Sequence, residues 1–270
     1  MAELLQKQTG DLITLESPQL GMFPQLRHAY FTRHGGVSQG VYESMNFRFT
    51  GTDSKETVME NYRIAAAYLG GSCDRLARTT QKHTDCIEIV GELEGFTNVG
   101  DGVDALITAT PGTIITGYFA DCQLVMLYDK KKHVCALAHS GWRGVVNGIV
   151  PKTIAKMQAE FGCNPADMIA AVSPSICSSC FETNDDVPAL LRDAYGALVQ
   201  EYMYKKDPKW HVDLRSITQM LLIRAGVLPL NIDISMRCTR CDREDLLWSH
   251  RRYGDARGVQ AGMMMLTPKK

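Results

Sequence analysis

The chain has 270 residues, of which 45% are hydrophobic and 22% are charged, an ordinary composition for a globular protein with a sizeable core. Its formal net charge of −1 gives no general attraction to nucleic acid or to an anionic membrane. No stretch approaches the roughly 20 apolar residues of a membrane span, the N-terminus holds no apolar signal core, and the nine cysteines are an odd number. We therefore expect a cytoplasmic protein with reduced thiols and no nucleic-acid or membrane partner.

The first half of the chain mixes strand-like segments with one clear helix. Short apolar runs predict strands at residues 11–15, 28–32, 103–108 and 113–119. Residues 53–69 place apolar side chains at helical spacing, and Asp53 or Ser54 is suited to cap this helix. Residues 78–90 are expected to be extended, with Ile87 and Ile89 facing the core.

A predicted hairpin lies at the centre of the chain. Residues 123–128 and 133–138 are strand-like, and the polar residues 129–132 join them. Cys122 comes just before the first strand and His139 just after the second, so pairing of the strands would bring both to its open end. A thiolate and an imidazole next to the start of a helix suit an anion or a metal site.

The second half of the chain is predicted to be more helical. Helices are expected at residues 145–161, 186–204 and 215–225, and strands at residues 169–172 and 233–236. Pro151 is expected in the first turns of its helix or at a kink. There is no internal repeat and no linker rich in Pro, Gly or Ser, so residues 1–270 are predicted to form a single α+β domain.

Two Cys-x-x-Cys pairs, Cys177/Cys180 and Cys238/Cys241, suggest a metal site at first sight. The 57 residues between them far exceed the roughly 15–20 residues of a compact zinc ribbon. We therefore expect unpaired buried or half-buried thiols that the chemistry does not need. A four-thiolate zinc site or a redox disulfide, formed where the pairs meet in space, is the alternative.

Two further segments carry candidate site residues. Residues 33–38 form a Gly-Gly turn with an arginine and a serine, which suits a phosphate or a ribose but also describes a surface loop. His83 precedes a predicted strand, and a histidine in isolation is more often a hydrogen-bonded structural residue than a ligand.

An ordered set of motifs along nearly the whole chain resembles the YfiH/YlmD family, also labelled the laccase-domain or polyphenol oxidoreductase laccase family. These motifs are residues 31–38, 44–46, 81–83, 104–108, 120–122, 139–144, 180–182, 210–214, 238–241 and 249–252. The resemblance implies mixed sheets packed on each other with helices outside, an α/β/β/α sandwich. It also implies one metal centre with the ligands His83, Cys122 and His139. Two imidazoles and one thiolate leave a fourth position open, as in catalytic zinc sites.

The activity that the resemblance implies is not unique. Family labels cover phosphorolysis of purine nucleosides such as adenosine, inosine, guanosine and methylthioadenosine, and also adenosine deamination. Older labels describe laccases, and one describes a peptidoglycan-editing role. Seven histidines without any His-x-His pair are too few for a multicopper site, so zinc is favoured over copper. We therefore expect a zinc-dependent enzyme whose partners are purine nucleosides and phosphate.

Further residues receive candidate roles within this hypothesis. Proton transfer by a carboxylate is assigned to Asp121 or Glu182. Binding of phosphate and substrate, with charge stabilisation by the arginines, is assigned to a set of polar residues. These are Arg33, Ser38, Asn46, Arg143 and Arg251.

Two alternatives use the same residues differently. A cysteine hydrolase would take Cys122 as nucleophile and His139 as base. A zinc-stabilised interaction protein would use the metal for folding alone. Metal content and the effect of replacing His83 distinguish these possibilities.

Overall fold

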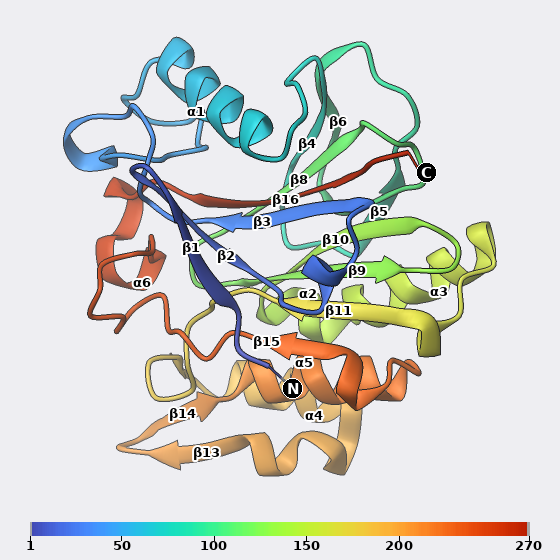
Figure 1. Cartoon of the computed structure of the whole chain (residues 1–270). Helices are drawn as coiled ribbons and strands as arrows, with labels where there is room; N and C mark the ends of the chain where they lie inside the picture. Colours follow the sequence, from blue (N-terminus) through green and yellow to red (C-terminus); the bar gives the residue numbers. More distant parts are fainter. Residues whose placement is uncertain (1, 269–270) are drawn as a thin grey trace.

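The computed structural model describes residues 2–268, which contain two large β-sheets facing each other, with helices on their outer sides (Figure 1). The first sheet has the strand order β1 (Leu5–Thr9), β2 (Leu12–Glu16), β3 (Leu26–Phe31), β16 (Gln260–Leu266), β8 (Ile114–Phe119), β4 (Arg75–Thr80) and β6 (Gly95–Asp101). The second has the order β15 (Ile232–Ile234), β11 (Met168–Val172), β9 (Gln123–Asp129), β10 (Val134–Ser140), β7 (Val103–Thr108) and β5 (Cys86–Ile89).

A third, small sheet and the helices complete the described chain. The small sheet pairs β12 (Glu182–Thr183), β14 (Lys209–Val212) and β13 (Met203–Lys206). The helices are α1 (Lys55–Tyr68), α2 (Trp142–Asn147), α3 (Ile149–Phe161), α4 (Asp186–Tyr195), α5 (Leu214–Arg224) and α6 (His250–Tyr253). Within residues 2–268, no helix combines the length and the apolar character needed to cross a membrane.

The layers follow from which strand faces are apolar. Alternate residues of β9 point to opposite faces: Met126 packs between the two sheets, whereas Val125 packs against the outer helices α3 and α5. All residues of β9 are buried, as expected for a strand covered on both faces. Helix α1 covers the outer face of the other sheet through Val58 and Tyr62 (Figure 1). The α+β class and the α/β/β/α sandwich are therefore confirmed.

Two predicted helices are shorter than expected. Gly148 adopts a left-handed backbone conformation (φ 70°) and divides the segment 145–161 into α2 and α3. Pro151 then lies in the first turn of α3, where its missing N–H costs nothing. Gly196 (φ 61°) ends α4, and the rest of the segment 186–204 forms a 3-10 helix and the start of β13.

Several strands escaped prediction or were placed inaccurately. Strand β1 is polar and fully exposed, so it carries no apolar alternation, and it is held by its antiparallel pairing with β2. The apolar strand β16 and the Gly-containing β6 were not predicted. Residues 78–90 form parts of β4 and β5 around a turn. Ile89 is 38% exposed, because β5 lies at a sheet edge, and the prediction that it faces the core is wrong.

Candidate functional site

The central hairpin forms as predicted and brings Cys122 and His139 to the same end. Strands β9 and β10 pair antiparallel, with Ser140 opposite Gln123 and His139 opposite Leu124. Cys122 directly precedes Gln123, so its side chain lies at the open end of the hairpin. His139 is the last but one residue of β10 rather than the residue after it.

His83 reaches the hairpin from the turn between β4 and β5. Its backbone is left-handed (φ 61°), a conformation that costs a non-glycine residue about 1 kcal/mol or more. The backbone N–H groups of Lys82, His83 and Thr84 all donate to the carboxylate of Asp104, at 2.9–3.0 Å. Hydrogen bonds to a charged acceptor are about twice as strong as neutral ones, so they offset this strain and fix the turn.

Asp104 links all the parts of this centre, and sequence reasoning gave it no role. It is 3% exposed, and besides the turn around His83 its carboxylate contacts Nδ1 of His139 at 2.7 Å. A carboxylate on Nδ1 fixes the imidazole so that Nε2 faces the other ligands, as is usual for metal-binding histidines. A signal was present in the sequence, because Asp104 is the one charged residue of β7, a strand whose other residues are four apolar side chains and Thr108.

His83, Cys122 and His139, here called the histidine–cysteine cluster, converge as the family resemblance implies. Their ligand atoms lie within 4.8 Å of one another, with Sγ of Cys122 3.6 Å from Nε2 of His83. A Cβ atom on Gly141 would lie 2.7 Å from that sulfur and 2.9 Å from Cδ2 of His83, so only glycine leaves room here. Metal–ligand bonds of about 2.0–2.3 Å fit a cluster of this size, and the donor set suits a three-ligand metal site.

The charges in the cluster are tuned by mutual contact. Burial raises the pKa of the Cys122 thiol, but hydrogen bonds and positive charge from His139 and His83 outweigh it and lower the pKa to about 6. Burial lowers the pKa of His139, yet Asp104 and Cys122 together raise it to about 9. For Asp104, burial is outweighed by the hydrogen bonds from His139 and from backbone N–H groups, and its pKa falls to about 2. Cys122 is therefore a thiolate near neutral pH, the form that binds metals.

The histidine–cysteine cluster opens into a cavity of about 740 Å³, within the range of small-molecule sites. Arginines and aromatic residues dominate the rest of its wall. They are Phe47, Arg48, Phe49, Tyr62, Arg78, Tyr118, Phe119, Trp142, Arg143, Phe181, Arg251 and Arg257. The cavity thus joins a metal-binding end to a positively charged, aromatic wall.

Besides the three residues of the histidine–cysteine cluster, three further predicted site residues line this cavity. Asp121, next to Cys122, accepts hydrogen bonds at 2.6 Å from Oγ1 of Thr239 and from the backbone N–H of Arg251. Arg143 follows the hairpin, and its guanidinium lies 4.1 Å from the ring centroid of Trp142. Arg251 is the second residue of α6, and its guanidinium donates to the carbonyl oxygen of Glu182 at 3.4 Å.

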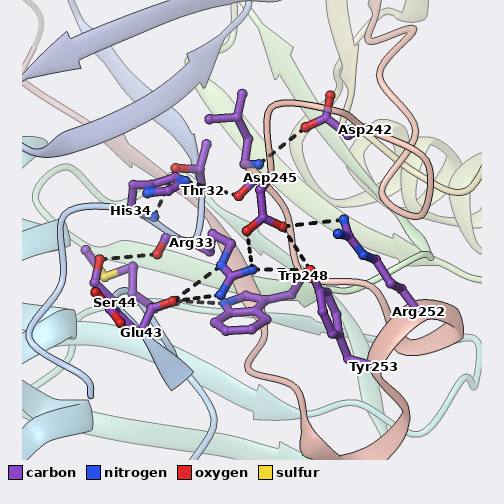
Figure 2. A network of polar contacts seen from close by, with 12 residues as sticks. Thr32, Arg33, His34, Glu43, Ser44, Asp242, Asp245, Trp248, Arg252 and Tyr253 are labelled. Carbon is purple, nitrogen blue, oxygen red and sulfur yellow. Dashed lines mark hydrogen bonds and ion pairs between the residues drawn. The ribbon is translucent and has the colours of Figure 1, made fainter. Parts of the chain in front are cut away.

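Arg33 lies outside the lining of the cavity, within a polar network of its own (Figure 2). Its guanidinium is 4.0 Å from the ring centroid of Trp248 and donates to the carbonyl oxygen of Glu43. It also contacts the carboxylate of Asp245 at 3.0 Å and the hydroxyl of Tyr253 at 3.3 Å. These contacts fasten the N-terminal turn to the C-terminal segment, so Arg33 serves the fold here rather than the cavity wall.

Ser38, Asn46 and Glu182 also lie outside the cavity wall. Ser38 and Asn46 are buried, and both donate to the carboxylate of Asp53. Oδ1 of Asn46 accepts from the backbone N–H of Arg48, so Asn46 supports a wall residue without facing the cavity. Glu182 is exposed in β12, and its contact with Arg251 is made by its backbone carbonyl.

Other wall residues were missed by sequence reasoning. Tyr62 is buried in the core under α1, and its hydroxyl contacts that of Tyr118 at 2.6 Å beside the cavity. Arg78 lies 5.0 Å from the ring centroid of Phe49. Within the described residues, Nε of Arg78 and Nε of Arg257 are buried without a hydrogen-bond partner. Nothing in the spacing of these residues relates them, because Tyr62 comes from α1, Arg78 from β4 and Arg257 from a loop near the C-terminus.

The two Cys-x-x-Cys pairs meet, contrary to the expectation of separate thiols. We call the four residues Cys177, Cys180, Cys238 and Cys241 the four-cysteine cluster. Their sulfur atoms lie within 4.8 Å of one another, and all four are free thiols. The long separation in sequence led to the wrong prediction that the pairs stay apart. The two motifs follow β11 and β15, which are neighbouring parallel strands. Parallel neighbours place the segments that follow them at the same edge of the sheet.

Comparison with known proteins agrees with this architecture. The profile of the family described as "Multi-copper polyphenol oxidoreductase laccase" matches residues 27–267. The crystal structure of YlmD from Geobacillus stearothermophilus superposes with a TM-score of 0.90 at 26% identity, covering 98% of this chain and all of that one. The sheets and the outer helices are thus shared over the whole length of both chains.

Curated relatives carry names of nucleoside enzymes. A purine nucleoside phosphorylase of Deinococcus radiodurans is 35% identical over 83% of each chain. The adenosine deaminase RL5, from an unknown prokaryotic organism, is 30% identical over 90% of this chain and 95% of its own. The mouse purine nucleoside phosphorylase LACC1 is 31% identical over 95% of this chain, which spans only 59% of the mouse protein. The chain belongs to the YfiH/YlmD family of laccase-domain proteins.

Proposed function

We propose that this protein is a zinc-dependent enzyme of purine nucleosides, which cleaves the bond between base and sugar with phosphate, deaminates adenosine, or does both. The observation that carries the proposal is the convergence of His83, Cys122 and His139 at one end of the large cavity. The names of the relatives support the substrate class. The wall of arginines and aromatic rings suits an anion and a flat heterocycle.

In this proposal the histidine–cysteine cluster holds the zinc ion. Two imidazoles and a thiolate favour zinc and leave one position open. When bound, zinc supplies Lewis-acid chemistry and lowers the pKa of water bound to it. The chain's own contribution is the fixed geometry, in which Asp104 orients His139 and the turn around His83.

The arginines of the cavity wall are proposed to bind phosphate, the second substrate of phosphorolysis. In phosphorolysis a phosphate oxygen forms a bond to C1′ of the ribose as the bond from C1′ to the purine nitrogen breaks. Arg143 and Arg251 are exposed in the cavity wall, where they can bind phosphate and balance its charge in the transition state. Tyr118 and Phe49 offer rings against which a purine base can stack.

A carboxylate beside the cluster accounts for proton transfer. Asp121 is the better candidate, because it lines the cavity next to Cys122, whereas Glu182 is exposed outside the wall. Thr239 and the backbone N–H of Arg251 donate to its carboxylate and hold it in place beside Cys122. Asp121 would then receive the proton in deamination and return it to the leaving group.

The test is an assay of the purified, metal-analysed protein with adenosine, inosine, guanosine and methylthioadenosine, each with and without phosphate. We expect a free base and a sugar 1-phosphate only when phosphate is present, and inosine from adenosine without it. His83→Ala should abolish both products and the zinc of this cluster, whereas His34→Ala, a half-buried histidine outside the cavity wall, should retain them. A zinc-loaded wild type that converts none of the four nucleosides would refute the proposal.

A cysteine hydrolase is the second candidate, because the order Asp104, His139, Cys122 also describes a nucleophile, a base and an orienting carboxylate. A thiolate bound to zinc is a poor nucleophile, so the two candidates exclude each other in one active state. His83 decides between them, since it has no necessary role in a Cys–His pair. Turnover that persists in zinc-free His83→Ala protein would favour the hydrolase.

We do not extend the proposal to multicopper oxidation. The chain has seven histidines, and among residues 2–268 the histidine–cysteine cluster and the four-cysteine cluster are the groups of three or more ligands that converge. Several coppers need many more imidazoles than the first cluster offers, and the second offers none.

A further inference from the structure

The four-cysteine cluster shares no residue with the histidine–cysteine cluster, does not line the cavity, and is not used by the proposed chemistry. We propose that Cys177, Cys180, Cys238 and Cys241 hold a second metal ion, a structural zinc that joins the loops after β11 and β15 at the rim of the cavity.

The topology explains why the two motifs are in register. Strands β11 and β15 pair in parallel, with Val172 opposite Ile234, and a further parallel bridge joins Ser175 to Cys238. The loops therefore continue side by side beyond the sheet. The backbone N–H of Cys177 donates to Sγ of Cys238 at 3.3 Å, so one motif already contacts the other. A hydrogen bond from a backbone N–H group stabilises the negative charge of a thiolate, which is the form of cysteine that binds a metal.

The donor set and its dimensions fit a zinc ion. Zinc–sulfur bonds of about 2.3 Å place the sulfurs of a tetrahedral site about 3.8 Å apart. The sulfurs of the cluster lie within 4.8 Å of one another, so small side-chain movements suffice to close the site. Four soft thiolates with no imidazole select zinc or iron over magnesium or calcium. Cys180 and Cys238 are buried and Cys241 is exposed, so the site lies at the surface with its inner half covered.

The position of the site gives it a structural task. Thr239, between the two cysteines of the second motif, holds the carboxylate of Asp121. The carbonyl oxygen of Cys180 accepts from Arg251 at 3.4 Å, and Ile176, just before the first motif, donates its backbone N–H to the carbonyl oxygen of Asp121. A metal that fixes both motifs thus fixes the residues on one side of the cavity. Four protein ligands leave no open position, which is typical of a structural site.

The first measurement needs no variant. X-ray absorption at the zinc edge of the wild-type protein, purified in reducing buffer without chelator, should show a first shell dominated by sulfur at about 2.3 Å. The histidine–cysteine cluster alone would give a shell dominated by nitrogen at about 2.0–2.1 Å, and that result would overturn the inference. The sulfur shell of the four-cysteine cluster is detected whether or not the protein acts on nucleosides. The measurement therefore tests this inference even if the proposed function is wrong.

The second measurement compares metal content. Cys177→Ser combined with Cys241→Ser should contain one zinc fewer per chain than the wild type. Cys86→Ser, which removes an exposed thiol outside both clusters, should retain the wild-type content. His83→Ala should lose the other equivalent and keep this one. Equal zinc in the double variant and the wild type, iron in place of zinc, or intact disulfides among the four cysteines in the mass spectrum of the purified protein would each overturn the assignment.

Discussion

The two cysteine-containing clusters of this chain are linked through the hydrogen bond from Thr239 to Asp121, yet they differ in the number and kind of their ligands. The histidine–cysteine cluster has three mixed ligands and opens into a cavity of about 740 Å³. The four-cysteine cluster offers four sulfurs of one kind, as many as the closed shell of the proposed structural zinc requires. Three ligands with an open position suit a reaction, whereas a filled shell suits a mechanical role. The number of ligands and the access to a cavity distinguish them better than the presence of cysteine.

The surroundings of the clusters differ in the same direction. Asp104 gives the histidine–cysteine cluster a buried charged partner that orients a ligand and tunes its pKa. The four-cysteine cluster is joined instead by backbone contacts between two loops. Thr239 connects the two regions. It lies between Cys238 and Cys241 in the sequence, and its hydroxyl donates to the carboxylate of Asp121, the residue next to Cys122. The following experiments test whether one region reacts and the other stabilises.

The largest effect is expected from Cys122→Ala. Turnover of nucleosides should fall more than about 100-fold, beyond the 10–100-fold that is typical when only the partner of a ligand is lost. The fold should persist, because β9 and its neighbours are held by buried apolar side chains. Cys135→Ala is the matched control, since it removes a buried thiol from the same hairpin without touching the cluster. Steady-state kinetics and circular dichroism check both variants, and full activity in Cys122→Ala would contradict the assignment of the reacting region.

Asp104→Asn should give the next largest effect. An amide offers one acceptor oxygen where the carboxylate now serves three backbone N–H groups and His139. We expect zinc affinity and turnover to fall about 10–100-fold. Asp101→Asn is the control, because Asp101 forms an exposed pair with Lys82 on the same turn. Zinc affinity is measured by competition with a chelator, and unchanged affinity in Asp104→Asn would show that Asp104 does not support the ligands.

Cys241→Ser should mainly reduce stability. Loss of one zinc ligand weakens the contribution of metal binding to folding, and a loss of about 2 kcal/mol lowers the melting temperature by roughly 5 °C in a protein of this size. Turnover should stay within about tenfold of the wild type, because Cys241 does not line the cavity. The melting temperature, measured by differential scanning calorimetry, is compared with that of Cys86→Ser, which replaces another exposed thiol outside the clusters. A loss of activity as large as that of Cys122→Ala would place the four-cysteine cluster in the reaction.

The smallest effect is expected from acid acting on His28, a buried histidine outside both clusters. Burial lowers the pKa of His28 from 6.5 to about 4, and its Nε2 accepts the N–H of Ser17. The unfolded chain therefore binds a proton that the folded chain excludes between these pH values, so stability falls as pH falls through this window.

At pH 5.5 this difference costs about 1.4 kcal/mol, the value of one pKa unit. His28→Gln should reduce the acid dependence of the free energy of unfolding, measured with metal-free protein to remove the contribution of the clusters. His34→Gln, a half-buried histidine, is the control and should leave the dependence unchanged. An identical pH profile in His28→Gln and the wild type would assign the acid sensitivity elsewhere.

Local patterns in the sequence determined much of the fold and half of the first cluster. The apolar runs of the hairpin predicted β9 and β10, and their antiparallel pairing placed Cys122 and His139 together. A cap of α1 by Asp53 or Ser54 was also predicted, since a cap depends on neighbouring residues alone. The structure selects Ser54, whose side chain accepts the N–H of Thr57. His83 entered the ligand set only through the family resemblance, because a single histidine in a turn carries no metal signal of its own.

The tertiary structure decided the remaining relations, since they join segments that are distant in sequence. Asp104 became the centre of the ligand network because β7 pairs with β10 and so faces the turn of His83. Arg33 lies outside the cavity wall, where it contacts Asp245 and Trp248, residues that follow it by more than 200 positions in the sequence. The four cysteines met because β11 and β15 are parallel neighbours. Strand pairing sets which side chains share an edge of a sheet, and that pairing is fixed by the packing of the whole sandwich rather than by any local spacing.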